Sequence, residues 1–154
     1  MAAALEQAKK AASKDEVPVG AVVVLENRVV ADGFNQTISN NDPTAHAEII
    51  AIRRACLKIG NYRLTDCELY VTLEPCCMCA GAVIQARLKN LYFGAHDKKS
   101  GVVSTDLNVF DNSKLNHHTA YAGGLLAGES KKLLQHFFEK KRKIKLNPTG
   151  LHFI

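Results

Sequence analysis

Apolar and polar residues follow one another along this chain with two spacings, one typical of helices and one typical of strands. Apolar residues at helical spacing predict α-helices over residues 2–14, 43–58, 75–88 and 126–143. Short apolar or alternating runs predict β-strands over residues 20–25, 28–31, 67–73, 90–94 and 118–122. Residues 95–116 read as a long loop with at most a short helix near 105–109. Helices and strands in this succession are typical of an α/β domain.

The order of these elements also predicts how the strands pair. A short polar turn joins the first two strands, so they form an antiparallel hairpin. The helix at 75–88 joins the next two, and a strand-helix-strand unit of this length implies a parallel pair with a right-handed crossover. We therefore predict a three-layer α-β-α fold in which helices flank a five-stranded mixed sheet.

Two of the predicted helices carry further expectations. The helix at 75–88 is apolar nearly all round, which predicts burial by more than its own sheet, for example in a subunit interface. In the helix at 126–143 we expect the apolar residues to face inward, namely Leu133, Leu134, Phe137 and Phe138. Core packing is the default for the two phenylalanines, and contact with a partner is the alternative.

Length and composition indicate one compact domain over residues 1–154. The chain has 154 residues and is 47% apolar, enough for a substantial core. No apolar run approaches the roughly 18 residues of a membrane-spanning helix. Charged residues interrupt the Ala-rich start, so no signal peptide is expected. Five cysteines, with three of them within residues 76–79, suit a metal site in a reducing compartment, and we expect a cytoplasmic protein.

Positive charge gathers at the carboxyl end, in the predicted helix and tail at about 126–154. The net charge of the chain is +5, and the densest basic cluster is the run Lys140, Lys141, Arg142 and Lys143. Such a cluster can bind phosphates. It can also simply solubilise a helix end and complement the helix dipole, and charge alone favours this second interpretation.

A sequence pattern for metal chemistry stands at the predicted starts of two helices. His46-Ala47-Glu48 opens one helix, and Cys76 and Cys79 open the next in a P-C-x-x-C run. One imidazole and two thiolates supply three zinc ligands, which is the number typical of catalytic sites that keep a position for water. Glu48 is then placed as the proton carrier for that water. Helix amino termini favour the thiolate form of both cysteines.

Less specific interpretations exist for each of these residues. A lone histidine at a helix start is usually a surface or capping residue, and a lone C-x-x-C can be redox-active or half of a structural zinc site. Cys56 and Cys67 lie too far along their elements to reach the motif. Cys77 is expected to be a buried small side chain. The combined motif, in this order and on these elements, favours catalytic zinc.

The H-x-E and P-C-x-x-C pattern is the signature of zinc-dependent nucleobase deaminases. The resemblance extends to the family of bacterial tRNA-specific adenosine deaminases, and it runs from about residue 4 to residue 143. It is carried by residues 18–23, 33–35, 42–48, 69–76, 78–82, 93–95 with Asp97, and 116–117. His96 and residues 102–104 depart from the pattern of this family, which leaves the contacts of the loop at 97–104 open.

The resemblance implies a fold, an activity and a set of functional residues. The fold would be cytidine-deaminase-like, and the protein a homodimer with one Zn²⁺ per subunit, held by His46, Cys76 and Cys79. The activity would be hydrolytic deamination of the wobble adenosine (position 34) of a tRNA anticodon, usually of an arginine tRNA, to inosine and ammonia. A zinc-bound hydroxide would attack the base, with Glu48 as proton shuttle. The substrate-binding residues would be Asn35, Ala47 and Asp97, and Lys140 to Lys143 could contact tRNA phosphates.

Two other functions compete with this expectation. One is an enzyme of the same fold that acts on a free base or nucleotide, such as guanine, cytosine or deoxycytidylate. The other is a non-catalytic zinc-dependent RNA-binding subunit. Glu48 argues against the second, because a non-enzyme has no need of a carboxylate beside an open metal position.

Overall fold

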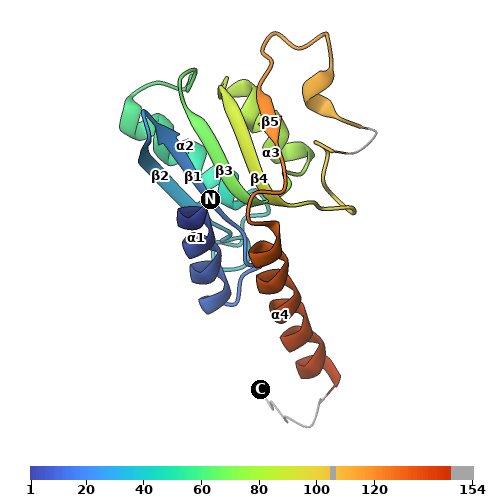
Figure 1. Ribbon diagram of the computed structural model, residues 1–154. Coiled ribbons are helices and arrows are strands. Elements are labelled where there is room, and N and C mark those ends of the chain that lie inside the picture. The colour runs from blue at the N-terminus through green and yellow to red at the C-terminus, as the bar shows by residue number, and fades with distance from the viewer. Residues whose placement is uncertain (105–106, 147–154) are drawn as a thin grey trace.

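The computed structural model describes residues 1–104 and 107–146 (Figure 1). The helices are α1 (Ala2–Ser13), α2 (Ala47–Ile59), α3 (Cys77–Gln85) and α4 (Ala127–Leu146), with a short 3-10 helix, η1, at Val109–Asp111. The strands are β1 (Gly20–Leu25), β2 (Arg28–Phe34), β3 (Glu68–Leu73), β4 (Asn90–Ala95) and β5 (Ala120–Ala122). The predicted helices and strands are therefore present.

Two boundary shifts fall at the site, at the starts of α2 and α3. Prediction began these helices at residues 43 and 75, whereas they begin at Ala47 and Cys77. His46 and Cys76 have extended backbone and act as the N-caps. The short helix expected near 105–109 lies slightly later, at Val109–Asp111, and residues 105–106 fall outside the described chain.

The five strands form one mixed sheet in the order β2-β1-β3-β4-β5. Strand β1 pairs antiparallel with both β2 and β3, whereas β3, β4 and β5 run parallel. This confirms the predicted hairpin and parallel crossover. One end of the sheet therefore gathers the start of β1 and the ends of β2, β3 and β4.

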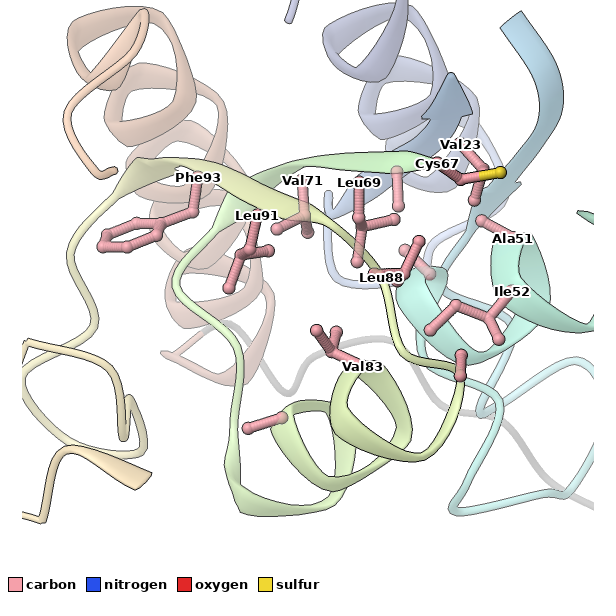
Figure 2. Close-up of a cluster of buried hydrophobic side chains, with 14 of the residues drawn as sticks. Val23, Ala51, Ile52, Cys67, Leu69, Val71, Val83, Leu88, Leu91 and Phe93 are labelled. Atoms are coloured by element: carbon pink, nitrogen blue, oxygen red, sulfur yellow. The ribbon is translucent and has the colours of Figure 1, made fainter. Parts of the chain in front are cut away.

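Helices cover the sheet on both sides, which confirms the three-layer α/β fold. Figure 1 shows α1 and α4 on one face and α2 and α3 on the other. The main core lies between the sheet and α2 and α3, where Leu69, Val71 and Leu91 are completely buried (Figure 2). Alternate residues point to the opposite face, on which the rings of Tyr70 and Tyr92 stack 4.8 Å apart.

Helix α4 packs close to β4 because Gly94 has no side chain. A Cβ atom at Gly94 would lie 2.6 Å from the hydroxyl oxygen of Ser130 on α4, too near for any other residue. The inward orientation predicted for α4 is only partly correct. Phe137 is buried with 8% of its surface exposed, but Phe138 is 45% exposed, because consecutive helix residues point about 100° apart.

None of the described helices is long and apolar enough to cross a membrane. Within the predicted basic segment at 126–154, α4 carries Lys140 to Lys143, and the tail at 147–154 lies outside the described residues.

Candidate metal centre and its cavity

The sequence motif comes together at the end of the sheet where β2, β3 and β4 finish. His46 and Cys76 cap α2 and α3, and Cys79 lies in the first turn of α3. Pro75 lies between β3 and α3, and Cys76 after it has the extended backbone of an N-cap. The spacing in the sequence therefore brings both cysteines to one helix start, and the packing of α2 beside α3 adds the histidine.

The distances among these side chains fit a metal ion. The Nδ1 atom of His46 lies 3.5 Å from Sγ of Cys79 and 3.7 Å from Sγ of Cys76. All three ligand atoms lie within 4.8 Å of one another. A tetrahedral ion with ordinary Zn–N and Zn–S bonds holds its nitrogen and sulfur ligands about 3.6 Å apart. Donor types and spacing thus both fit, and the group could hold a metal ion.

The surroundings of the two thiols shift their pKa values in opposite directions. Hydrogen bonds from Cys79 and His46 lower the pKa of Cys76 to about 3. The hydrogen bond to Cys76 and burial raise the pKa of Cys79. At neutral pH the pair therefore holds at least one thiolate, and a bound cation would favour the thiolate form of the second sulfur as well.

Glu48 lies beside these ligands and has only 4% of its surface exposed. Burial raises the pKa of Glu48 to about 7, against the opposing effect of hydrogen bonds and of the nearby His46. A carboxyl group with this pKa can both accept and release a proton near neutral pH.

A cavity of about 250 Å³ opens over this group. Its lining includes the predicted residues His46, Glu48, Cys76, Asn35 and Asp97. Sequence reasoning missed four polar or charged residues of this region, namely Thr37, Glu74 and Ser100 in the lining and the fully buried Glu16, which accepts a hydrogen bond from Thr37. The position of Glu74 in the sequence could have indicated a structural role. A carboxylate between an apolar strand and Pro75 is expected to be buried and therefore needs hydrogen-bond partners.

Asn35 is held in a fixed orientation. Its Oδ1 atom accepts a hydrogen bond of 2.9 Å from the backbone N–H of Ala47. The Nδ2 donor of Asn35, which lines the cavity, has no hydrogen-bond partner among the described residues. Ala47 itself is completely buried and is absent from the cavity lining. Its direct contact with substrate stays a prediction, and what the structure shows is that it orients Asn35.

Other predicted residues lie away from the cavity. The side chains of Lys140 and Lys143 line a separate open groove of about 510 Å³ along α4, together with His136, Glu139 and Ile144. Cys56 and Cys67 are not part of the metal group, as expected. The expectation that Cys77 is buried is wrong, because Cys77 is exposed on the outer side of α3.

Known proteins resemble this chain in sequence and in fold. Residues 1–142 match the profile of the family of MafB19-like deaminases. A tRNA-specific adenosine deaminase from Haemophilus influenzae is 49% identical, over 92% of this chain and 83% of its own length. A solved structure from a study of tRNA:A34 deaminases superposes with a TM-score of 0.82 and 47% identity, and covers 85% of this chain and 95% of its own. Guanine deaminase from Bacillus subtilis superposes with a TM-score of 0.59 and 42% identity, over 62% of this chain and 61% of its own.

The three-layer fold, the His-Cys-Cys group and the family match define a protein of the deaminase class. Since relatives of 41–49% identity match over nine-tenths of its length, the chain belongs to the family of tRNA-specific adenosine deaminases.

Proposed function

We propose that this protein hydrolyses the wobble adenosine (position 34) of a tRNA anticodon, as in an arginine tRNA, to inosine with release of ammonia. One observation carries the proposal: the His46, Cys76 and Cys79 group opens into the cavity that Glu48 and Asn35 line, in a chain that matches tRNA-specific adenosine deaminases over most of its length. The catalytic domain is taken to span residues 1–154.

The proposed cofactor is one Zn²⁺ per subunit, bound by His46, Cys76 and Cys79. When bound, it would supply an activated water for attack on the base. Glu48 lines the cavity and can take one proton from the attacking water and deliver it to the ring nitrogen, and can then pass a second proton, from the newly formed hydroxyl group, to the amine as it departs. The Nδ2 donor of Asn35 can hydrogen-bond an acceptor atom of the purine and hold it in register.

The proposed RNA contacts lie outside the cavity as well as in it. Asp97 at the rim would meet nucleotides that flank the target base, which must leave its stack to enter. Helix α4 starts next to β4 and projects past the end of the sheet, as Figure 1 shows. Lys140, Lys141, Arg142 and Lys143 would contact phosphates there.

A homodimer in the cytoplasm is also part of the proposal. Helix α3 supports it, because Cys77 is exposed and Met78, Ala82 and Ile84 are only partly buried on a helix with few polar residues. A second copy of the chain could cover this surface.

Guanine deamination is the second candidate, because the Bacillus subtilis guanine deaminase matches part of this chain. The deciding experiment incubates the full-length protein with an arginine tRNA that carries wobble adenosine and, separately, with adenosine, guanine and cytosine. Inosine in the tRNA alone is the expected result. Release of ammonia from a free base without tRNA turnover would contradict the proposal, and no turnover by the zinc-loaded protein would favour a non-catalytic subunit.

A further inference from the structure

Two loops form the sides of the cavity. The first loop, residues 35–46, follows β2 and contributes Thr37, and the second loop, residues 96–104, follows β4 and contributes Asp97 and Ser100. Neither loop contains a helix or strand, so its shape depends on other hydrogen bonds. In both cases several of these bonds converge on one buried carboxylate.

The second loop is folded around Glu74, which has 3% of its surface exposed. One oxygen of Glu74 accepts bonds from the N–H of Val103 (3.0 Å) and from the N–H and hydroxyl of Ser104 (2.7 and 2.9 Å). The other oxygen accepts the N–H of Asp97 at 3.0 Å. These partners come from the two ends of the loop, so the carboxylate holds both ends together.

The same loop is joined to the metal-binding segment. The N–H of Val102 donates to the carbonyl oxygen of Pro75, the residue before Cys76. A Cβ atom at Gly101 would lie 2.5 Å from the carboxyl carbon of Glu74, so only glycine allows this approach. Asp97 is held in turn by two bonds from its own loop, the N–H groups of Lys99 and Ser100 at 3.0 and 3.2 Å.

The first loop is folded around Glu16 in the same way. Glu16 is fully buried, and its oxygens accept the N–H and hydroxyl of Ser39 at 2.7 and 2.8 Å. They also accept the N–H of Ile38 at 3.2 Å and the hydroxyl of Thr37 at 3.3 Å. Thr37 is one of three residues of this loop in the cavity lining, with Asn35 and His46 at the two ends of the loop.

We propose that Glu74 and Glu16 are positioning residues for substrate recognition: each carboxylate holds one side of the cavity in the shape that receives the nucleotides beside the target base. This rests on the proposed function. Glu74 belongs to the cavity lining and Glu16 does not, but the hydrogen bonds of both carboxylates go to loop residues. They would therefore act on substrate binding more than on the chemical step.

The test uses Glu74→Gln and Glu16→Gln in the zinc-loaded full-length protein. Each amide keeps the size of the side chain but turns an N–H group toward a backbone donor. We expect about a tenfold rise in KM for an anticodon stem-loop with a smaller change in kcat, and unchanged zinc content. Glu68→Gln, at the opposite end of β3, is the matched control and should leave both constants unchanged. A fall in kcat at constant KM would overturn the proposal.

Substrates with an abasic site distinguish a variant that has lost recognition of one nucleotide from a variant whose structure is disturbed in general. If a loop receives the nucleotide 5′ or 3′ of the target, the KM penalty of its variant should shrink when that nucleotide is abasic. An equal penalty on every substrate would overturn the recognition role. Ser104→Ala, which removes one bond to Glu74, provides a milder variant and should show the same pattern on a smaller scale if Glu74→Gln does not fold.

Amide hydrogen exchange tests the loops without any substrate. The amides of Asp97, Val103 and Ser104 should exchange slowly in the wild type and faster in Glu74→Gln, while those of Ile38 and Ser39 respond only to Glu16→Gln. Unchanged exchange would overturn the holding role. Failure of the wild type to deaminate the stem-loop would instead contradict the proposed function, so the two failures are distinguishable.

Discussion

The cavity and α4 differ in how far their candidate functional groups are buried. Around the cavity, buried candidate groups such as Glu48 and Cys79 would each carry a distinct chemical task under the proposed function. The candidate RNA contacts on α4 are several exposed charges, which would share one task, so that no single charge would be decisive. Buried groups have no water to replace a lost partner, whereas exposed charges share their work and are screened by salt. Single substitutions should therefore be severe in the cavity and mild on α4.

The largest effect is expected from Cys76→Ala. Loss of one of the three ligands should release the metal and abolish deamination. Zinc content by atomic emission and inosine formation should both fall to background. Cys77→Ala is the matched control, because this neighbouring thiol is exposed and outside the metal group, and it should keep zinc and activity. Full zinc retention in Cys76→Ala would contradict the assigned ligand set.

Glu48→Gln should keep zinc but lower kcat by about 10³-fold, because proton transfer by a placed side chain contributes roughly 10²–10⁴-fold. Single-turnover inosine formation together with metal analysis measures both quantities. Glu48 is close to the metal group without belonging to it. If this variant loses its zinc, Glu48 is a ligand and the proposed role is wrong.

Substitutions of Phe137 and Phe138 allow a buried and an exposed position on α4 to be compared. Phe137→Ala should lower the free energy of unfolding by about 3 kcal/mol, because truncation of a buried ring leaves a cavity. Phe138→Ala should change it by less than about 0.5 kcal/mol, since 45% of this residue is exposed. Denaturant unfolding of both variants gives the two values. Equal losses would mean that a partner or second subunit buries Phe138.

Neutralising the basic cluster should have a smaller, salt-dependent effect. Replacement of Lys140, Lys141, Arg142 and Lys143 by Ala should weaken tRNA binding by about tenfold and flatten its dependence on salt, because fewer counterions are released. Each single replacement should cost much less. Filter binding from low to high KCl measures the slope. An unchanged slope would return these residues to a purely solubilising role.

The smallest effect concerns the dependence of stability on pH. Burial opposes ionisation of Glu16, but hydrogen bonds from Ser39, Ile38 and Thr37 outweigh it and lower the pKa below the usual 4.5. A pKa lowered by folding means that the carboxylate stabilises the fold above pH 4.5 and loses this contribution as the pH falls through its folded value. The Tm difference between wild type and Glu16→Gln should thus shrink at acid pH. A constant difference would contradict this linkage.

Much of the fold could be predicted because it depends on local patterns. Alternation in 67–73 and helical spacing in 43–58 reflect the repeat of each backbone, so element types followed directly. The starts of α2 and α3 were placed too early, because Pro43 and Pro75 favour helix starts in general. Only the packed structure shows that His46 and Cys76 themselves are the extended caps.

The sequence by itself predicted the candidate ligand set, the adjoining carboxylate, the initial hairpin and the parallel crossover, since short spacings and chain connectivity carry that information. Only the tertiary structure decided which side of α3 leaves Cys77 exposed and which phenylalanine of α4 is buried. It also decided that Glu16 and Glu74 hold the two loops of the cavity. These outcomes depend on contacts between residues that are distant in the chain, and no local repeat records them.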